Sequence, residues 1–154
     1  MKIHILFGTE SGNSEMVATD LQEAWDGAHD VELDDLADFD PGSFDAETLY
    51  LVICSTHGEG EPPQSAVPFI ERMQAARPDV NGVRYAMFGL GDSTYPDYSR
   101  GSEHIDSLLT ELGAERVGAY GRHDASSRDD ASELVQQWAQ DALSVAFAPE
   151  TSRA

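Results

Sequence analysis

The chain has 154 residues, of which 40% are hydrophobic, and its formal net charge is −20. This charge would repel nucleic acids and anionic membranes and attract basic proteins, and the only cysteine, Cys54, excludes an intramolecular disulfide and a cysteine-based metal site. No stretch approaches the ~20 apolar residues that span a bilayer, and the amino terminus lacks the pattern of a signal peptide, so we expect a cytoplasmic protein of one compact domain.

Short apolar runs alternate with longer amphipathic runs along the whole chain. The apolar runs predict strands at Lys2–Phe7, His29–Leu33, Leu49–Ser55, Arg84–Leu90 and Arg116–Tyr120. The amphipathic runs predict helices at Ser14–Trp25, Ser65–Arg77, Gly101–Leu112 and Asp129–Phe147. The first, third and fourth strands are nearly continuous hydrophobic runs, as expected of strands covered on both faces. The alternation indicates a parallel sheet with helices packed against it.

Several smaller features accompany this pattern. Val17, Leu21 and Trp25 form one apolar stripe on the first helix, and residues 36–46 combine Asp, Pro and Gly, which predicts a loop with at most a short turn of helix. Residues 1–148 are expected to form the domain and residues 149–154 a loose tail. We expect Cys54 to fill space in the core and both tryptophans to pack against the sheet. Four histidines show no ligand spacing and are expected to be structural or exposed: His4, His29, His104 and His123.

The loop after the first strand has the composition of an anion site. It reads Gly8-Thr9-Glu10-Ser11-Gly12-Asn13-Ser14 and leads into a helix, whose first N–H groups and positive dipole end face the loop. Its three hydroxyls can donate hydrogen bonds and Gly12 permits close approach of the backbone. The loop lacks the lysine of a Walker A loop, which binds nucleoside triphosphates, and the third glycine of a dinucleotide-binding loop. A monophosphate is the ligand that fits best, and an ordinary capped turn is the alternative.

The loops after the third and fourth strands carry further clusters, and in a parallel sheet all three loops emerge at one edge. They read Ser55-Thr56-His57-Gly58-Glu59-Gly60-Glu61-Pro62-Pro63 and Phe88-Gly89-Leu90-Gly91-Asp92-Ser93-Thr94-Tyr95-Pro96-Asp97-Tyr98. Together with the first loop, these motifs resemble the flavodoxin family, in particular its short MioC-type members, and the FMN domains of diflavin reductases.

The resemblance implies a flavodoxin-like α/β fold, with three layers around a doubly wound, five-stranded parallel sheet of order 2-1-3-4-5 and a short chain. It implies flavin mononucleotide (FMN) as the cofactor, with Thr56 near its phosphate or ribityl chain, the Gly58-Glu59 peptide facing flavin N5, and His57 and Tyr95 against the two ring faces. The residues expected to bind FMN are Thr9, Glu10, Ser11, Gly12, Asn13, Ser14, Ser55, Thr56, His57, Gly58, Glu59, Gly60, Gly89, Leu90, Gly91, Asp92, Tyr95 and Tyr98.

The resemblance also implies a function as a monomeric electron carrier without enzyme activity of its own. Such a protein would pass single electrons, through the semiquinone/hydroquinone couple, from an NADPH-flavodoxin reductase to acceptors with basic surfaces such as biotin synthase. A flavin-dependent NAD(P)H:quinone reductase is the alternative. A receiver-type signalling domain is excluded, because it needs a lysine on its last strand and the only lysine of this chain is Lys2.

Overall fold

The computed structural model describes residues 2–8, 13–25, 27, 30–45, 47–55, 66–91, 100–118, 120–124 and 131–146. In chain order, the elements within these residues are β1 (Lys2–Gly8), α1 (Asn13–Trp25), β2 (Asp30–Asp35), the 3₁₀ turns η1 (Leu36–Asp38) and η2 (Pro41–Ser43), β3 (Thr48–Ser55), α2 (Val67–Ala76), β4 (Arg84–Gly91), α3 (Arg100–Glu111), β5 (Glu115–Arg116), β6 (Gly121–Asp124) and α4 (Ala131–Ala146). The four predicted helices are confirmed, with ends close to those expected. None of the described helices combines the length and the apolar character needed to cross a bilayer.

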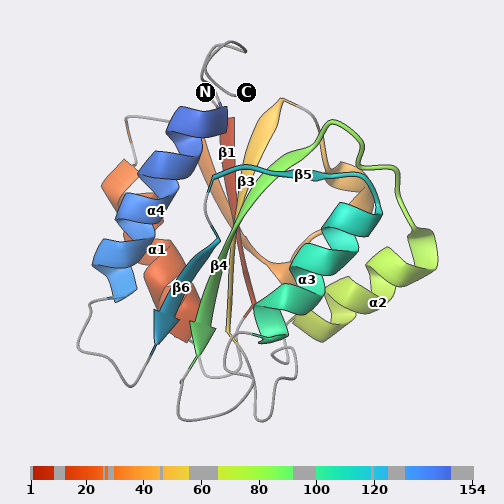
Figure 1. Cartoon of the computed structure of the whole chain (residues 1–154), viewed down its shortest axis with the longest axis horizontal. Helices are drawn as coiled ribbons and strands as arrows, with labels where there is room; N and C mark the ends of the chain where they lie inside the picture. The colour runs from red at the N-terminus through yellow and green to blue at the C-terminus, as the bar shows by residue number, and fades with distance from the viewer. Residues whose placement is uncertain are drawn as a thin grey trace.

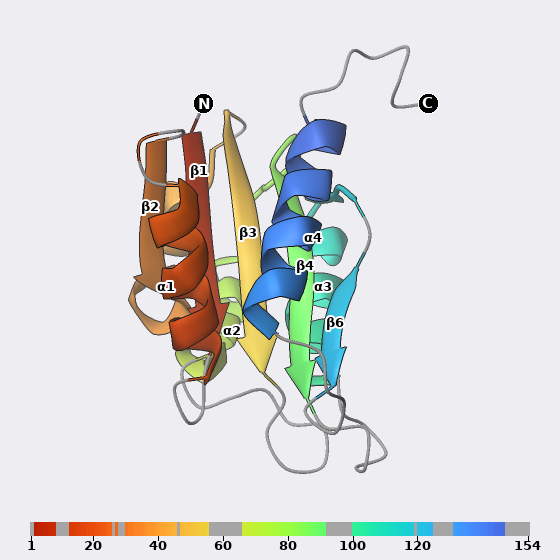
Figure 2. The same ribbon diagram turned by 90° about the vertical axis from the view of Figure 1, so that its left-hand side faces the viewer.

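The sheet is parallel throughout and has the order β2-β1-β3-β4, with β5 and β6 both paired to the outer edge of β4. Helices α1 and α4 cover one face and α2 and α3 the other, so the molecule has three layers (Figures 1 and 2). Since β5 and β6 share one position in the sheet, the predicted order 2-1-3-4-5 and the flavodoxin-like fold are confirmed.

The fifth strand differs from its prediction. A continuous strand at Arg116–Tyr120 is wrong: β5 pairs with the first residues of β4, β6 pairs with the last, and residues 117–120 lie between them. Gly118 has φ +73°, which takes the backbone out of the extended conformation beside α4. The segment Gly-Arg-His-Asp of β6 has no apolar alternation, and its pairing with β4 places it in the sheet.

Two hydrophobic cores lie on opposite faces of the sheet. Successive side chains of β1 alternate between them: Ile5 and Phe7 face α1 and α4, whereas Leu6 faces α2 and α3. The predicted stripe on α1 packs into the first core, where Trp138 of α4 is also buried. Cys54 is fully buried in the second core, as predicted for an apolar filler. Burial on both faces accounts for the nearly continuous hydrophobic sequences of β1, β3 and β4.

The segment after β2 lies over α2 and is held by an arginine. It contains two 3₁₀ turns, which agrees with the predicted loop, and the carboxylates of Asp35 and Asp40 cap them by accepting from backbone N–H groups. Arg72 of α2 donates to the carbonyl oxygens of Leu36, Ala37 and Phe39 at 3.1, 2.7 and 3.1 Å. One guanidinium therefore supplies donors to three backbone acceptors and fastens the segment to the helix.

Candidate functional site

The carboxyl ends of the strands meet at one edge of the sheet. Gly8 of β1 lies in register with Cys54, Cys54 with Gly89, and Gly89 with Arg122, so the strands end at nearly the same level. The strand arrows in Figure 2 point to this common edge. Since neighbouring strands are ~4.8 Å apart, the ends of β1 and β4 are separated by only about 10 Å. The three loops that the sequence singles out therefore start from adjacent positions.

The amino end of α1 lies at the same edge, because the helix begins at Asn13, shortly after β1 ends at Gly8. The first backbone N–H groups of a helix have no acceptor within it, and they point outward together with the positive end of the helix dipole. This is the arrangement that binds phosphate in many proteins. The described backbone therefore fits the phosphate end of a mononucleotide.

The end of β1 is closely packed around a glycine. A Cβ on Gly8 would approach Cys54 Sγ at 3.0 Å, Leu36 Cδ1 at 3.1 Å and Ala66 Cβ at 3.2 Å. Ala66 directly precedes α2, so the amino ends of α1 and α2 both lie near the point where the chain leaves β1. Because Gly8 has no Cβ, the chain can leave β1 between two helix amino ends without pushing aside the side chains of the second core.

The structure describes part of the predicted site. Asn13 and Ser14 form the start of α1, Ser55 ends β3, and Gly89, Leu90 and Gly91 end β4, so these residues are brought to one edge. The Leu90 side chain is buried in the core beneath α1 and α4. The remaining predicted residues lie outside the described residues: Thr9, Glu10, Ser11, Gly12, Thr56, His57, Gly58, Glu59, Gly60, Asp92, Tyr95 and Tyr98.

Cys54 lies directly beneath this edge, between Gly8 and Gly89 in the sheet. Burial raises the pKa of its thiol far above the ordinary value of 9.0. The thiol is therefore protonated near neutral pH and adds neither charge nor a nucleophile to the edge. Redox chemistry at this edge has to come from a bound cofactor.

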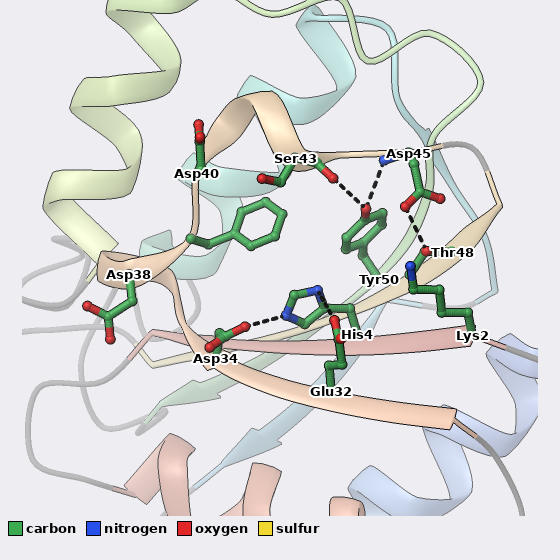
Figure 3. Close-up of a pocket in the computed structure, with 11 residues that line it drawn as sticks. Lys2, His4, Glu32, Asp34, Asp38, Asp40, Ser43, Asp45, Thr48 and Tyr50 are labelled. Atoms are coloured by element: carbon green, nitrogen blue, oxygen red, sulfur yellow. Dashed lines mark hydrogen bonds and ion pairs between the residues drawn. The ribbon is translucent and has the colours of Figure 1, made fainter.

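A cavity of about 370 Å³ lies elsewhere, beside the amino-terminal half of β1 (Figure 3). His4 of β1 lies in its floor, with Nε2 2.8 Å from Asp34 Oδ2 and Nδ1 3.6 Å from Glu32 Oε2. His4 is 8% exposed, so of the two predicted alternatives, structural or exposed, the exposed one does not hold. Nothing in the sequence spacing of His4 indicates these partners, because only the pairing of β1 with β2 brings residues 4, 32 and 34 together. The alternation of acidic residues along β2 is the one signal that could have indicated the cavity.

Comparisons with known proteins show which family and which solved folds this chain is similar to. The flavodoxin family profile matches residues 5–138. The chain is 36% identical to the sulfite reductase (NADPH) flavoprotein alpha-component of Thiocapsa roseopersicina, over 92% of this chain and 27% of the relative. It is 33% identical to the inducible nitric oxide synthase of Bos taurus, over 88% of this chain and 12% of the relative.

Solved flavodoxin structures match the whole fold. A cysteine-to-serine mutant of the flavodoxin from Pseudomonas aeruginosa is 30% identical, with a TM-score of 0.77 and coverage of 97% of this chain and 100% of that one. The flavodoxin from Streptococcus pneumoniae is 26% identical, with a TM-score of 0.75 and coverage of 94% and 99%. By contrast, the chain spans about a quarter of the length of the sulfite reductase flavoproteins that it matches.

Proposed function

This chain belongs to the flavodoxin family, and from that premise we propose that it carries single electrons between a reductase and acceptor proteins. It is a flavodoxin-like, FMN-binding electron-transfer domain. The observation that carries the proposal is the common edge at which β1, β3 and β4 end in register and α1 begins, within a family match that spans residues 5–138. When bound there, FMN supplies the one-electron chemistry.

We propose that residues 9–14 and Thr56 hold the FMN phosphate with hydroxyl and backbone donors. The amino end of α1 supports this assignment, because its N–H groups favour an anion without any lysine nearby in sequence. At the ring end, His57 and Tyr95 are proposed to lie against the two faces of the flavin ring. The carbonyl of the Gly58-Glu59 peptide is proposed to accept a hydrogen bond from the flavin N5–H. The end of β4 at Gly91 supports a position for the Tyr95 loop beside the Ser55 loop.

The proposed partners are basic-surfaced redox proteins, such as an NADPH-flavodoxin reductase and acceptors of the biotin synthase kind. Two observations support this part of the proposal: the net charge of −20, which favours association with basic surfaces, and the similarity to NADPH-dependent flavoproteins. The charge also opposes self-association, which supports a monomeric carrier.

Binding of FMN and of riboflavin by the apoprotein tests the assignment of residues. Riboflavin lacks the phosphate, so the ratio of its Kd to that of FMN measures phosphate recognition alone. Ser11→Ala and Ser14→Ala are each expected to weaken FMN about tenfold and riboflavin hardly at all, since a hydrogen bond to a charged group is lost. Tyr95→Ala should weaken both ligands to a similar extent, because it acts on the ring.

Ser144→Ala is the matched control, since Ser144 is an exposed hydroxyl on α4 outside the proposed site. A wild-type protein that binds riboflavin as tightly as FMN would contradict the phosphate assignment. Equal weakening of FMN by Ser11→Ala and by Ser144→Ala would do the same.

Anaerobic reduction of the holoprotein separates an electron carrier from an NAD(P)H:quinone reductase. A carrier is expected to be reduced by NADPH only when a flavodoxin reductase is added, and to accept its two electrons in separate one-electron stages during photoreduction. Rapid oxidation of NADPH by the protein alone, with a quinone as acceptor, would overturn the carrier proposal in favour of the enzyme.

A further inference from the structure

Strand β2 lies at one end of the sheet, and its two faces differ in chemistry. Within the described residues β2 pairs with β1 alone, so the backbone groups on its outer side have no strand opposite them. Asp30, Glu32 and Asp34 project from the face that carries the cavity, and all three are exposed. Val31 and Leu33 project from the other face, half-buried against the core under α1. The edge is therefore acidic on one face and apolar on the other.

The cavity beside β2 extends the acidic face. Five carboxylates line it, from Glu32, Asp34, Asp38, Asp40 and Asp45, together with Lys2 and His4 (Figure 3). Aromatic rings close its floor: the ring centroid of His4 lies 5.2 Å from that of Phe39 and 5.9 Å from that of Tyr50. The side chain of Glu32 is 58% exposed at the mouth, so a ligand can reach it.

The chemistry of this surface selects a basic occupant. Among the described residues no group of carboxylates or histidines is arranged to hold a metal ion. A second copy of β2 would bring its own acidic residues against these, at a like-charge cost, and acidic edges commonly prevent such pairing. An unpaired strand edge can instead accept an extended peptide, whose main chain completes the ladder and whose alternate side chains reach opposite faces.

We propose that β2 and the adjoining cavity bind an extended segment of another protein in which arginine or lysine alternates with apolar residues. The basic side chains of the added strand lie beside Glu32 and Asp34, and one enters the cavity. Its apolar side chains cover the exposed parts of Val31 and Leu33. Lys2, which lines the same cavity, is a competing cation. The cavity lies beside the amino-terminal ends of β1 and β3, away from the carboxyl-terminal edge assigned to the cofactor.

The probe is a short synthetic peptide in which arginine alternates with valine, titrated into the FMN-loaded protein. A second peptide with proline in place of each valine keeps the charge but lacks the backbone N–H of every second residue, so it cannot form a regular β ladder. The alternating peptide is expected to bind at least about tenfold more tightly than the proline peptide, and to slow hydrogen exchange of the outward-facing β2 amides. Equal binding of the two peptides, or unchanged exchange in β2, would overturn the proposal in favour of nonspecific attraction to an acidic protein.

Two charge-matched double variants locate the surface. Glu32→Gln with Asp38→Asn removes two exposed carboxylates at the cavity, and neither residue caps a turn. Glu23→Gln with Asp141→Asn removes two exposed carboxylates from α1 and α4. The first pair is expected to weaken the alternating peptide about tenfold and the second pair less than about twofold. Equal losses in both pairs would show that only the net charge matters and would overturn the proposal.

Discussion

Gly121 shows how tightly a single residue can be constrained in this protein. A Cβ at this position would lie 2.4 Å from Phe88 Cδ2 and 2.8 Å from Trp138 Cδ1, closer than nonbonded atoms can approach. Phe88 and Trp138 meet edge to face with centroids 5.4 Å apart, and both are buried. Glycine at residue 121 therefore lets β6 pair with β4 under a large aromatic contact between the sheet and α4.

Gly121→Ala is expected to lower the free energy of unfolding by about 1–3 kcal/mol, because the added methyl group overpacks a site that cannot expand freely. Gly42→Ala is the control: its Cβ would meet only Asp40 Oδ1 at 3.5 Å, and its stability should stay within about 0.5 kcal/mol of the wild type. Urea unfolding followed by circular dichroism measures both. A Gly121→Ala protein as stable as the Gly42→Ala protein would contradict this packing.

At the scale of elements, one phenol joins β4, α3 and β5. The hydroxyl of Tyr85 in β4 donates to Asp106 Oδ1 at 2.7 Å and lies 2.8 Å from Thr110 Oγ1, both on α3. Arg116 of β5 donates to the other oxygen of Asp106 at 2.8 Å. Burial is the main cause that raises the pKa of Tyr85 well above its ordinary value of 10.0, and the Asp106 carboxylate adds to it. The network thus favours the protonated phenol in the folded state.

Tyr85→Phe is expected to cost about 1–2 kcal/mol near neutral pH, since the hydrogen bonds of the phenol are lost. Because the folded pKa is raised, the unfolded chain releases the Tyr85 proton first, and wild-type stability falls as the pH rises above about 10. The variant lacks this contribution, so the stability difference between the two proteins should shrink between about pH 8 and about pH 11. Urea midpoints at the two pH values measure this change. A difference that stays constant would show that the Tyr85 phenol ionises equally in both states.

The charge of the whole molecule is its most unusual property. Acidic residues outnumber Lys and Arg by 29 to 9, and residues 30–47 contain eight acidic residues and neither Lys nor Arg. Among the described residues, the ion pair between Arg77 and Glu111 is exposed on both sides, so it relieves little of this repulsion. Self-repulsion between like charges destabilises the compact state, and dissolved salt screens it.

Raising KCl from about 0.1 M to about 1 M shortens the Debye length from ~10 Å to ~3 Å and should raise the urea midpoint of unfolding. Choline chloride at equal ionic strength is the control and should have a similar effect, because screening does not depend on the identity of the cation. A midpoint independent of salt would contradict the role of self-repulsion. A much larger effect of KCl would indicate specific binding of potassium ions.

The sequence by itself determined the layers and the composition of the three loops, and the resemblance of those loops to the flavodoxin family implied the strand order. Apolar runs of β1, β3 and β4 are long and nearly continuous because both faces of these strands are buried, and the stripe on α1 repeats with the helical period. Such signals are local, so they can be read from neighbouring residues. The motifs at residues 9–14, 55–63 and 88–98 indicate the family for the same reason, since each lies within one loop.

Only the tertiary structure decided which distant residues meet. The break between β5 and β6 depends on a positive φ at Gly118 and on pairing with β4, and no apolar period marks β6. Strand β2 continues through Asp34 and Asp35, beyond its predicted end at Leu33, because its pairing with β1 outweighs the poor strand propensity of aspartate. His4 acquires its carboxylate partners through the same pairing. These contacts join residues about 30 positions apart, and their energy comes from packing and pairing that a local pattern does not contain.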